Sequence, residues 1–232
     1  PILILLFVGA LAGSWLISGI IPAMIYYGLQ IFHPLFFLPA CVIICAIISI
    51  STGSSWTTSA TIGIALIGIG RAMEINTGIV AGAIISGAYF GDKLSPLSDT
   101  TNLAAAMANS NLFNHIRYMT LTTVPSIIIS LLFFISIGFF QTTTEDVNNI
   151  SLVNSIDEKF FINPILFLVP VLVIAMILKK TPPLIALMTG TILAALFALV
   201  FQPNIVLEIT NSNKLTLNSA YRGIIDAITI ET

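Results

Sequence analysis

The sequence predicts an all-α membrane protein, a multi-span bundle in which several helices are broken or re-entrant. Of its 232 residues, 57% are hydrophobic and only 8% are charged, and the mean hydropathy is +1.05. A soluble domain carries about a quarter charged residues, so this composition excludes a water-soluble globular protein. No Asp, Glu, Lys or Arg precedes Arg71. Glycine, proline and hydroxyl residues interrupt the apolar stretches and indicate the breaks.

The apolar stretches divide the chain into candidate membrane spans, each of which needs about 20 mostly apolar residues. We expect spans near 2–29, 35–50, 75–90, 119–140, 162–178 and 182–201. The sequence starts at Pro1 inside an apolar run and ends just after an amphipathic stretch at 221–228. We therefore expect a fragment of a longer protein, with a first transport region at 1–140 and the start of a second half at 161–232.

The distribution of charge predicts the orientation of the chain in the membrane. The stretch 141–160 carries four acidic side chains and a single lysine. Arg117 and the pair Lys179–Lys180 lie at the other ends of the two adjoining spans. Because loops on the cytoplasmic side carry an excess of Lys and Arg, we expect these basic residues on that side and 141–160 to form an external acidic loop.

An uncharged polar segment, 49–63, follows the second span. It is rich in serine and threonine around Gly53, which indicates a break in the helix. Broken helices at membrane depth occur only where they line a cavity or are buried in protein. Their hydroxyl and carbonyl oxygens are ligands that suit a hard cation. The candidate ligands are Ser54, Ser55, Thr57 and Thr58. The alternative is that these hydroxyls only cap helices and bond backbone carbonyls.

A second polar segment, 86–108, contains the carboxylates Asp92 and Asp99 and the ammonium of Lys93. A carboxylate near the centre of a bilayer costs about 3 kcal/mol, so an intramembrane carboxylate is taken as functional by default. Burial favours its neutral form, whereas a bound cation favours its charged form. One such group can therefore hold either a proton or Na⁺, but not both.

Asp99 is the first candidate for this role, because neutral oxygens surround it in the sequence. They belong to Ser98, Thr100, Thr101 and Asn102. The segments 55–59 and 98–102 share the pattern Ser-x-Thr-Thr, which leads us to expect one Na⁺ site that includes Asp99, Thr100 and Thr57. The alternative role for Asp99 is a helix N-cap. Asp92 ranks second, because the neighbouring Lys93 offers it a counter-charge in place of a bound cation.

Four stretches closely resemble the NhaC family of bacterial Na⁺/H⁺ antiporters, which includes Na⁺-coupled malate/lactate antiporters. They are Ser-Gly-x-x-Pro-x-x-Ile-Tyr-Tyr-Gly at 18–28, Ser-Thr-Gly-Ser-Ser-Trp-Thr-Thr at 51–58, Ser-Gly-Ala-Tyr-Phe-Gly-Asp-Lys-Leu-Ser-Pro-Leu-Ser-Asp-Thr-Thr-Asn-Leu-Ala at 86–104 and Leu-Phe-Asn-His-Ile-Arg at 112–117. The resemblance is strong over 1–140, and beyond that it rests on hydropathy alone. It implies an ion-transporter-type fold with an inverted repeat in the full-length protein, of which 1–140 is the first repeat.

The resemblance also implies a secondary transporter that exchanges Na⁺ for H⁺ across the bacterial plasma membrane, with no cofactor beyond these ions. Exchange coupled to malate or lactate is the alternative within the family. A passive ion channel is a rival from another class, because hydroxyl and carbonyl rings also build filters.

An intramembrane aspartyl protease is disfavoured, because Tyr89 stands where its glycine-x-glycine-aspartate pattern needs a glycine. The zinc-protease pattern His-Glu-x-x-His is also absent, so we expect no enzyme. The net charge of -2 identifies no partner, because the charges lie in loops and one cluster and form no surface field. Nucleic acid is not an expected partner, whereas the lipid bilayer is.

Overall fold

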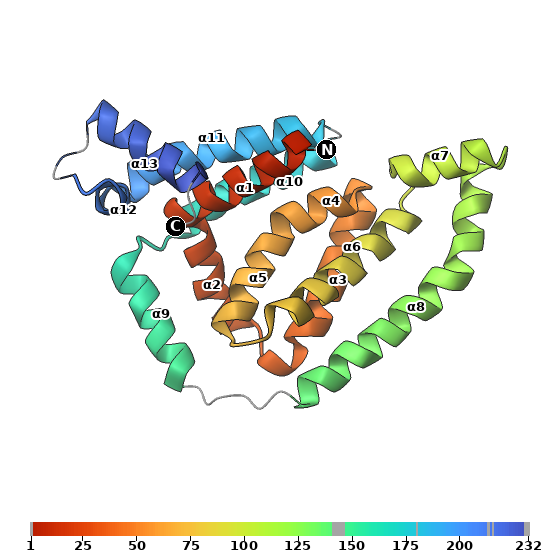
Figure 1. Ribbon diagram of the computed structural model, residues 1–232. Helices are drawn as coiled ribbons and strands as arrows, with labels where there is room; N and C mark the ends of the chain where they lie inside the picture. The colour runs from red at the N-terminus through yellow and green to blue at the C-terminus, as the bar shows by residue number, and fades with distance from the viewer. Residues whose placement is uncertain (1, 141–146, 180, 213, 215, 230–232) are drawn as a thin grey trace. The chain divides into compact units, whose positions relative to one another are not determined.

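The computed structural model describes residues 2–140, 147–179, 181–212, 214 and 216–229 (Figure 1). These residues form helices and short connections, with no strand among them. The predicted all-α class is therefore confirmed.

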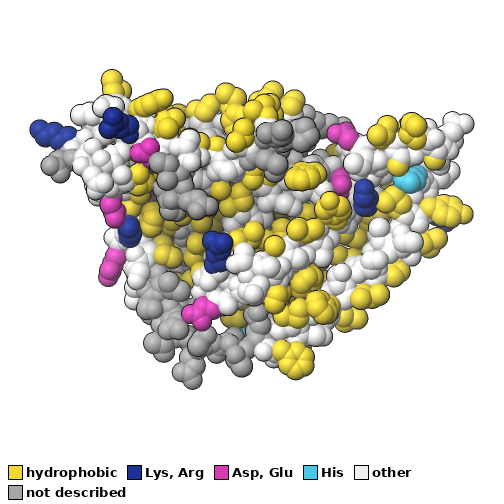
Figure 2. All heavy atoms as spheres, in the orientation of Figure 1, with side chains coloured by type: hydrophobic (Ala, Val, Ile, Leu, Met, Phe, Trp, Pro, Cys, Tyr) yellow, Lys and Arg dark blue, Asp and Glu magenta, His cyan; other side chains and the backbone are white. Residues whose placement is uncertain are grey.

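Three helices in the described ranges are long and apolar enough to cross a membrane. They are α3 (Pro34–Thr52), α8 (Leu112–Phe140) and Leu184–Phe201, which is most of α11 (Pro183–Phe201). Two further pairs pass the same criteria together but are sharply bent, Leu6–Ile17 with Ile20–Ile31 by 72° and Val153–Lys159 with Pro164–Leu178 by 89°. Figure 2 shows hydrophobic side chains along the outer edge of α8, where only 11% of the most apolar stretch is buried. The chain is a multi-pass membrane protein.

The chain packs as two compact units, Pro1–Tyr27 with Ile150–Thr232, and Gly28–Asn149. This grouping does not follow the expected division near residue 140, because α1 (Ile2–Ile17) packs against α11 and α13 (Leu217–Thr229). Helix α2 (Ile20–Ile31) carries the chain from the first unit into the second.

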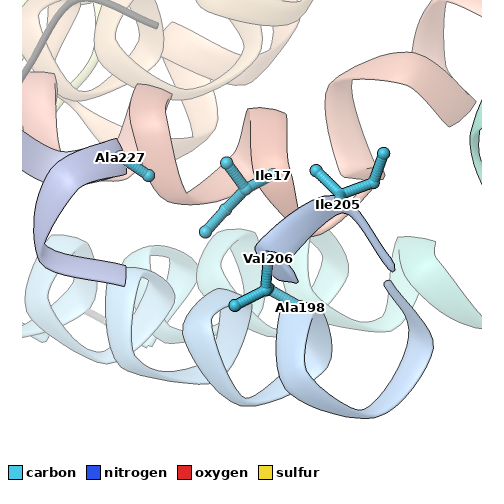
Figure 3. Close-up of a cluster of buried hydrophobic side chains, with 5 residues drawn as sticks. All are labelled: Ile17, Ala198, Ile205, Val206 and Ala227. Atoms are coloured by element: carbon cyan, nitrogen blue, oxygen red, sulfur yellow. The ribbon is translucent and has the colours of Figure 1, made fainter. Parts of the chain in front are cut away.

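In the first unit, the ends of four helices meet in a small apolar core. Figure 3 shows its members, Ile17 from α1, Ala198 from α11, Ile205 and Val206 from α12 (Pro203–Ile209) and Ala227 from α13. Gly13 allows the close approach of α13, because a Cβ at this position would collide with the backbone of Ala227. The unit also contains α9 (Val147–Lys159) from Ile150 onward, the 3₁₀ turn η2 (Pro164–Phe167) and α10 (Leu168–Leu178).

Helix α9 occupies much of the stretch 141–160 that was expected to be a loop. Residues 141–146 lie outside the described ranges, and from Val147 the chain is helical. An exposed ion pair between Lys159 Nζ and Glu208 Oε1, 3.2 Å apart, joins the end of α9 to α12. On which side of the membrane this stretch lies stays a prediction.

In the second unit, α3 and α6 (Thr77–Leu94) form the closest helix pair. Gly87 and Gly91, four positions apart on α6, lie against the backbone of α3 at Val42 and Ala46, and a Cβ at either glycine would collide with a carbonyl oxygen there. Small residues at this spacing let two helix backbones touch. Helix α8 packs against both α3 and α6. The tight α3–α6 contact sets the rotation of α6 and therefore the direction in which its last turn faces.

The remaining helices of this unit follow the break after α3. Helix α3 begins at Pro34, a residue favoured at the first helical position, and ends at Thr52. Gly53 follows it with a φ of 71°, the left-handed conformation typical of the residue after a helix. Helix α4 (Ser55–Thr58), the π-helical turn η1 (Ser59–Gly63) and α5 (Ile64–Ala72) come next, and α7 (Asp99–Met107) follows α6. The polar segment 49–63 is thus a broken helix that resumes at once.

Candidate functional site

Two helix breaks of the second unit pack on each other. The first is at Gly53, after α3, and the second is the connection 95–98, after α6. A Cβ at Gly53 would lie 2.6 Å from the carbonyl carbon of Leu97, so only glycine fits against this connection. The Ser95 hydroxyl donates to the carbonyl oxygen of Ile50 at 2.7 Å, which gives a partner to one of the free carbonyls at the end of α3. The two polar segments predicted from the sequence therefore form one region.

Asp92 lies at the centre of this region. Its side chain is only 6% exposed, and the hydroxyl of Ser55, which is also buried, lies 3.3 Å from its Oδ2. Ser49 contributes to the same contact between the helices, since its hydroxyl donates to the carbonyl oxygen of Ala88 at 2.5 Å. A buried carboxylate with a hydroxyl partner, next to a broken helix, has the chemistry to hold either a desolvated cation or a proton.

The hydroxyls of 54–58 bond mainly to one another and to the backbone. Ser54 caps α4, where its Oγ accepts from the backbone N–H of Thr57 at 3.3 Å and from the Thr57 hydroxyl at 3.0 Å. The Thr58 hydroxyl donates to the Ser54 carbonyl oxygen at 2.9 Å. The capping role considered from the sequence is therefore present. It does not remove these residues as cation ligands, because a hydroxyl that donates its proton still carries lone pairs.

The geometry at the start of α7 differs from the expectation for Asp99. The N-cap is Ser98, whose Oγ accepts from the N–H of Thr101 at 3.3 Å. Asp99 is the first residue of the helix, and its side chain is exposed. There it complements the positive end of the helix dipole. The proposed N-cap role of Asp99 is therefore wrong. Within the described ranges, no hydrogen bond links Asp99 to 54–58.

Thr101 is the buried hydroxyl of this helix start. Its Oγ1 lies 3.4 Å from the carbonyl oxygens of both Asp92 and Lys93, which ties α7 to the last turn of α6. Thr100 is exposed and accepts from Lys93 Nζ at 3.2 Å, with the Ser98 hydroxyl 3.0 Å away. Thr100 and Thr57, the two threonines expected around one Na⁺ ion, thus have different immediate partners.

Asn102 stabilises the connection 95–98 between α6 and α7. Its side-chain amide donates to the carbonyl oxygens of Pro96 and Ser98 at 2.9 and 2.8 Å. It stabilises the turn 95–98 rather than presenting its amide to Asp92.

The sequence reasoning did not single out Ser49 or Ser95. Both lie in the polar segments 49–63 and 86–108 but were not among the candidate ligands, and their importance comes from bonds to residues 39 and 45 positions away. The serine before Pro96 was the available signal, because a residue before proline tends to leave the helix. Among the described residues, no three His, Cys, Asp or Glu side chains gather in one place.

Comparison with known proteins gives a consistent result. The chain matches the Na⁺/H⁺ antiporter family over residues 87–223. It is 43% identical over 203 residues to the malate-2H⁺/Na⁺-lactate antiporter of Bacillus subtilis, a match that covers 87% of this chain and 43% of that protein. It is 41% identical over 206 residues to the Na⁺/H⁺ antiporter NhaC of Alkalihalophilus pseudofirmus, covering 88% of this chain and 44% of the relative.

A third relative is named for another kind of substrate. The arginine/ornithine antiporter ArcD of Halobacterium salinarum is 41% identical over 142 residues, which cover 61% of this chain and 29% of that protein. No solved structure matches the chain. The chain spans less than half the length of each of these relatives.

Proposed function

Because this chain belongs to the Na⁺/H⁺ antiporter family, we propose that the full-length protein exchanges Na⁺ for H⁺ across the bacterial plasma membrane and that Asp92 holds each ion in turn. The family is one of secondary transporters, not of enzymes. The observation that carries the proposal is the burial of Asp92 against the Ser55 hydroxyl, beside the helix break at Gly53.

The exchange at this carboxylate balances in charge. The protonated acid gives up its proton as Na⁺ binds, so the site is neutral in both loaded states and costs little to bury. With Na⁺ bound, the Ser55 hydroxyl turns a lone pair to the ion instead of its proton to Asp92. The buried hydroxyls of Thr57 and Thr58 lie in the same short helix and are the further ligands we assign.

The helix break beside Asp92 is a second feature that supports the proposed ion site. Discontinuous helices in transporters place free backbone groups at substrate sites near the middle of the membrane. Here the last turn of α3 and the connection after α6 supply these groups, and the hydroxyls of Ser49 and Ser95 hold the two breaks together. Asp99, the first candidate from the sequence, is the alternative carrier.

Transport by the full-length protein in proteoliposomes tests the proposal. An imposed Na⁺ gradient should move protons in the opposite direction, and Asp92→Asn, which keeps the shape of the side chain but loses its charge, should reduce this flux to that of empty liposomes. Passive conduction is distinguished by its inability to move H⁺ against its own gradient. If internal pH never responds to Na⁺, the proposed exchange is wrong.

A second candidate function, movement of a small carboxylate together with Na⁺, is favoured by one further feature. A groove lies between the last turns of α6 and the middle of α8. Lys93 is among its lining residues, and no Asp or Glu is.

A further inference from the structure

Helix α4, which carries the hydroxyl partner of Asp92, is a single turn of four residues between two irregular joints. The break at Gly53 precedes it, and the π-helical turn η1 follows it. A one-turn helix is not stable by itself, because the first turn orders several residues for one hydrogen bond. The direction of the Ser55 hydroxyl therefore depends on what holds the two joints.

Helix α4 and η1 run along α6 and contact it at two points. At one end, the Ser55 hydroxyl lies 3.3 Å from Asp92 Oδ2. At the other end, Gly63 lies against Ile84, where a Cβ on the glycine would come within 3.0 Å of Ile84 Cγ2. The second contact fixes the end of η1 on α6 independently of the ion site.

The π-helical turn decides which way Ser55 faces relative to Gly63. Successive residues of an α-helix are rotated by about 100°, so two residues eight positions apart differ by about 80° in direction. A π-helical turn takes up one extra residue, because its bonds run to the fifth residue instead of the fourth, and the difference falls to about 20°. Ser55 and Gly63 can therefore both face α6. If the same residues formed a regular α-helix, Ser55 would be rotated away from Asp92.

Thr61 holds this turn from within. Its side chain is only 1% exposed, and its hydroxyl donates to the carbonyl oxygen of Thr57 at 2.8 Å and lies 3.5 Å from that of Thr58. In an α-helix the backbone N–H of residue 61 is the donor to the Thr57 carbonyl. In η1 the backbone bonds reach one residue further, and the Thr61 hydroxyl supplies a donor to that carbonyl. This bond joins the end of α4 to the wider turn.

We propose that Thr61 is a positioning residue of the cation site, which keeps η1 in its π-helical form and so holds the Ser55 hydroxyl on Asp92. The inference rests on the proposed function in one respect, namely that Asp92 binds Na⁺. Thr61 acts through Ser55 and is not itself a ligand. A ligand oxygen that is already oriented binds the ion more tightly than one that must first be ordered.

Equilibrium binding of radioactive Na⁺ to the purified full-length protein in lipid nanodiscs tests the proposal. Thr61→Val keeps the shape of the side chain but loses the hydroxyl, and we expect it to weaken Na⁺ binding about fivefold, as for one hydrogen bond. Thr61→Ser, which keeps the hydroxyl, should bind Na⁺ as wild type does.

Thr191→Val is the matched control. The Thr191 hydroxyl is also buried and also donates to the carbonyl oxygen four residues earlier, that of Leu187, at 2.9 Å. Its bond lies within the continuous helix α11 of the first unit. Thr191→Val should therefore leave Na⁺ binding unchanged.

A double mutant separates positioning from general stabilisation. If Thr61 acts through Ser55, Thr61→Val should have little further effect once Ser55 is alanine, so the double mutant should bind Na⁺ about as tightly as Ser55→Ala alone. Wild-type affinity in Thr61→Val, an equal loss in Thr191→Val, or losses that add in the double mutant would each overturn the proposal.

A second variant keeps the test valid if Thr61→Val does not fold. Gly63→Ala adds a methyl group that meets Ile84, which displaces η1 from α6. It should also weaken Na⁺ binding, and not further in the Ser55→Ala background. Wild-type affinity in Gly63→Ala, or a loss that adds to that of Ser55→Ala, counts against the positioning role.

The binding measurement is independent of Na⁺/H⁺ exchange. Na⁺ binding that depends on Thr61 through Ser55, in a protein whose internal pH never responds to Na⁺, would disprove the exchange and keep the positioning role. Exchange that is lost in Asp92→Asn, but whose Na⁺ dependence is the same in Thr61→Val and wild type, would do the reverse. Absence of Na⁺ binding to wild type would overturn both.

Discussion

The chain contains two helix breaks at glycines in the left-handed conformation, one in each unit. Gly19 separates α1 from α2 with φ 79°, and Gly53 separates α3 from α4 with φ 71°. At Gly19 the neighbours are neutral: the Gln202 side chain lies against the glycine and bonds the backbone N–H and carbonyl of Phe161. At Gly53 the neighbour is a second break, and Asp92 lies beside it.

The difference lies in the groups that surround each break. At Gly19 the Gln202 amide supplies one donor and one acceptor to the backbone of Phe161. These bonds stabilise the bend, and no charged group takes part in them. At Gly53 a carboxylate is buried with a single hydroxyl partner in the described region, so its charged state needs a cation. We therefore propose that ions bind beside Gly53, whereas the break at Gly19 is a structural bend.

The largest expected effect distinguishes the two carboxylates near Gly53. Asp92→Asn should abolish Na⁺-dependent proton movement, because an amide cannot carry a proton or neutralise Na⁺. Asp99→Asn should keep most of it, since this side chain is exposed at the start of α7. Both are measured with a pH-sensitive dye in proteoliposomes, at matched protein content. Loss of exchange in Asp99→Asn alone would restore the assignment predicted from the sequence.

The next largest difference is expected between alanine substitutions of the two glycines. Alanine at either position enters the left-handed region at a cost of about 1 to 2 kcal/mol. Gly53→Ala adds a collision with the backbone of Leu97, whereas Gly19→Ala meets the end of the Gln202 side chain, which can move. We expect Gly53→Ala to lower the thermal stability of the purified protein more than Gly19→Ala, and to weaken Na⁺ activation as well. Equal effects on both quantities would mean that the two breaks serve the same purpose.

Competition between Na⁺ and H⁺ gives a pH-dependent effect. If one carboxylate holds either ion, the Na⁺ concentration for half-maximal exchange rises as pH falls, by at most about tenfold per pH unit. The rise should be seen in wild type and in Gly19→Ala alike. Half-saturation by Na⁺ that is constant from pH 6 to 9 would show that the ions bind at different groups.

The smallest effect is expected from removing single hydroxyls at the two breaks. Ser55→Ala removes the partner of Asp92 and should raise the Na⁺ concentration for half-maximal exchange about fivefold, the loss expected for one ligand or hydrogen bond. Thr57→Val and Thr58→Val should act in the same direction. Ser18→Ala is the matched control, because Ser18 lies in the turn next to Gly19 and its hydroxyl donates to the Trp15 carbonyl of α1. An equal shift in Ser18→Ala would indicate a general effect of packing.

By itself, the sequence determined the all-α membrane class, the helix breaks and the types of side chain near them. These properties are local: apolar length, a glycine among hydroxyls and a serine before proline each act on neighbouring residues. The family resemblance came from the same contiguous stretches. The predicted membrane spans 2–29 and 162–178 largely overlap bent helix pairs, a result that depends on packing as well as on composition.

Only the tertiary structure decided which carboxylate meets the hydroxyl segment. Asp92 and Asp99 are seven positions apart and chemically alike, and in the sequence the surroundings of Asp99 were the more polar. The choice follows from the rotation of α6, which Gly87 and Gly91 set by their contact with α3, and this rotation directs Asp92 to a serine 37 positions away. The groove between α6 and α8 also depends on this rotation. Lys93, the residue after Asp92, lines that groove and bonds to Thr100, whereas Asp92 contacts Ser55. Local sequence determines where a helix ends, but the partners of its last turn depend on helices that are distant in the chain.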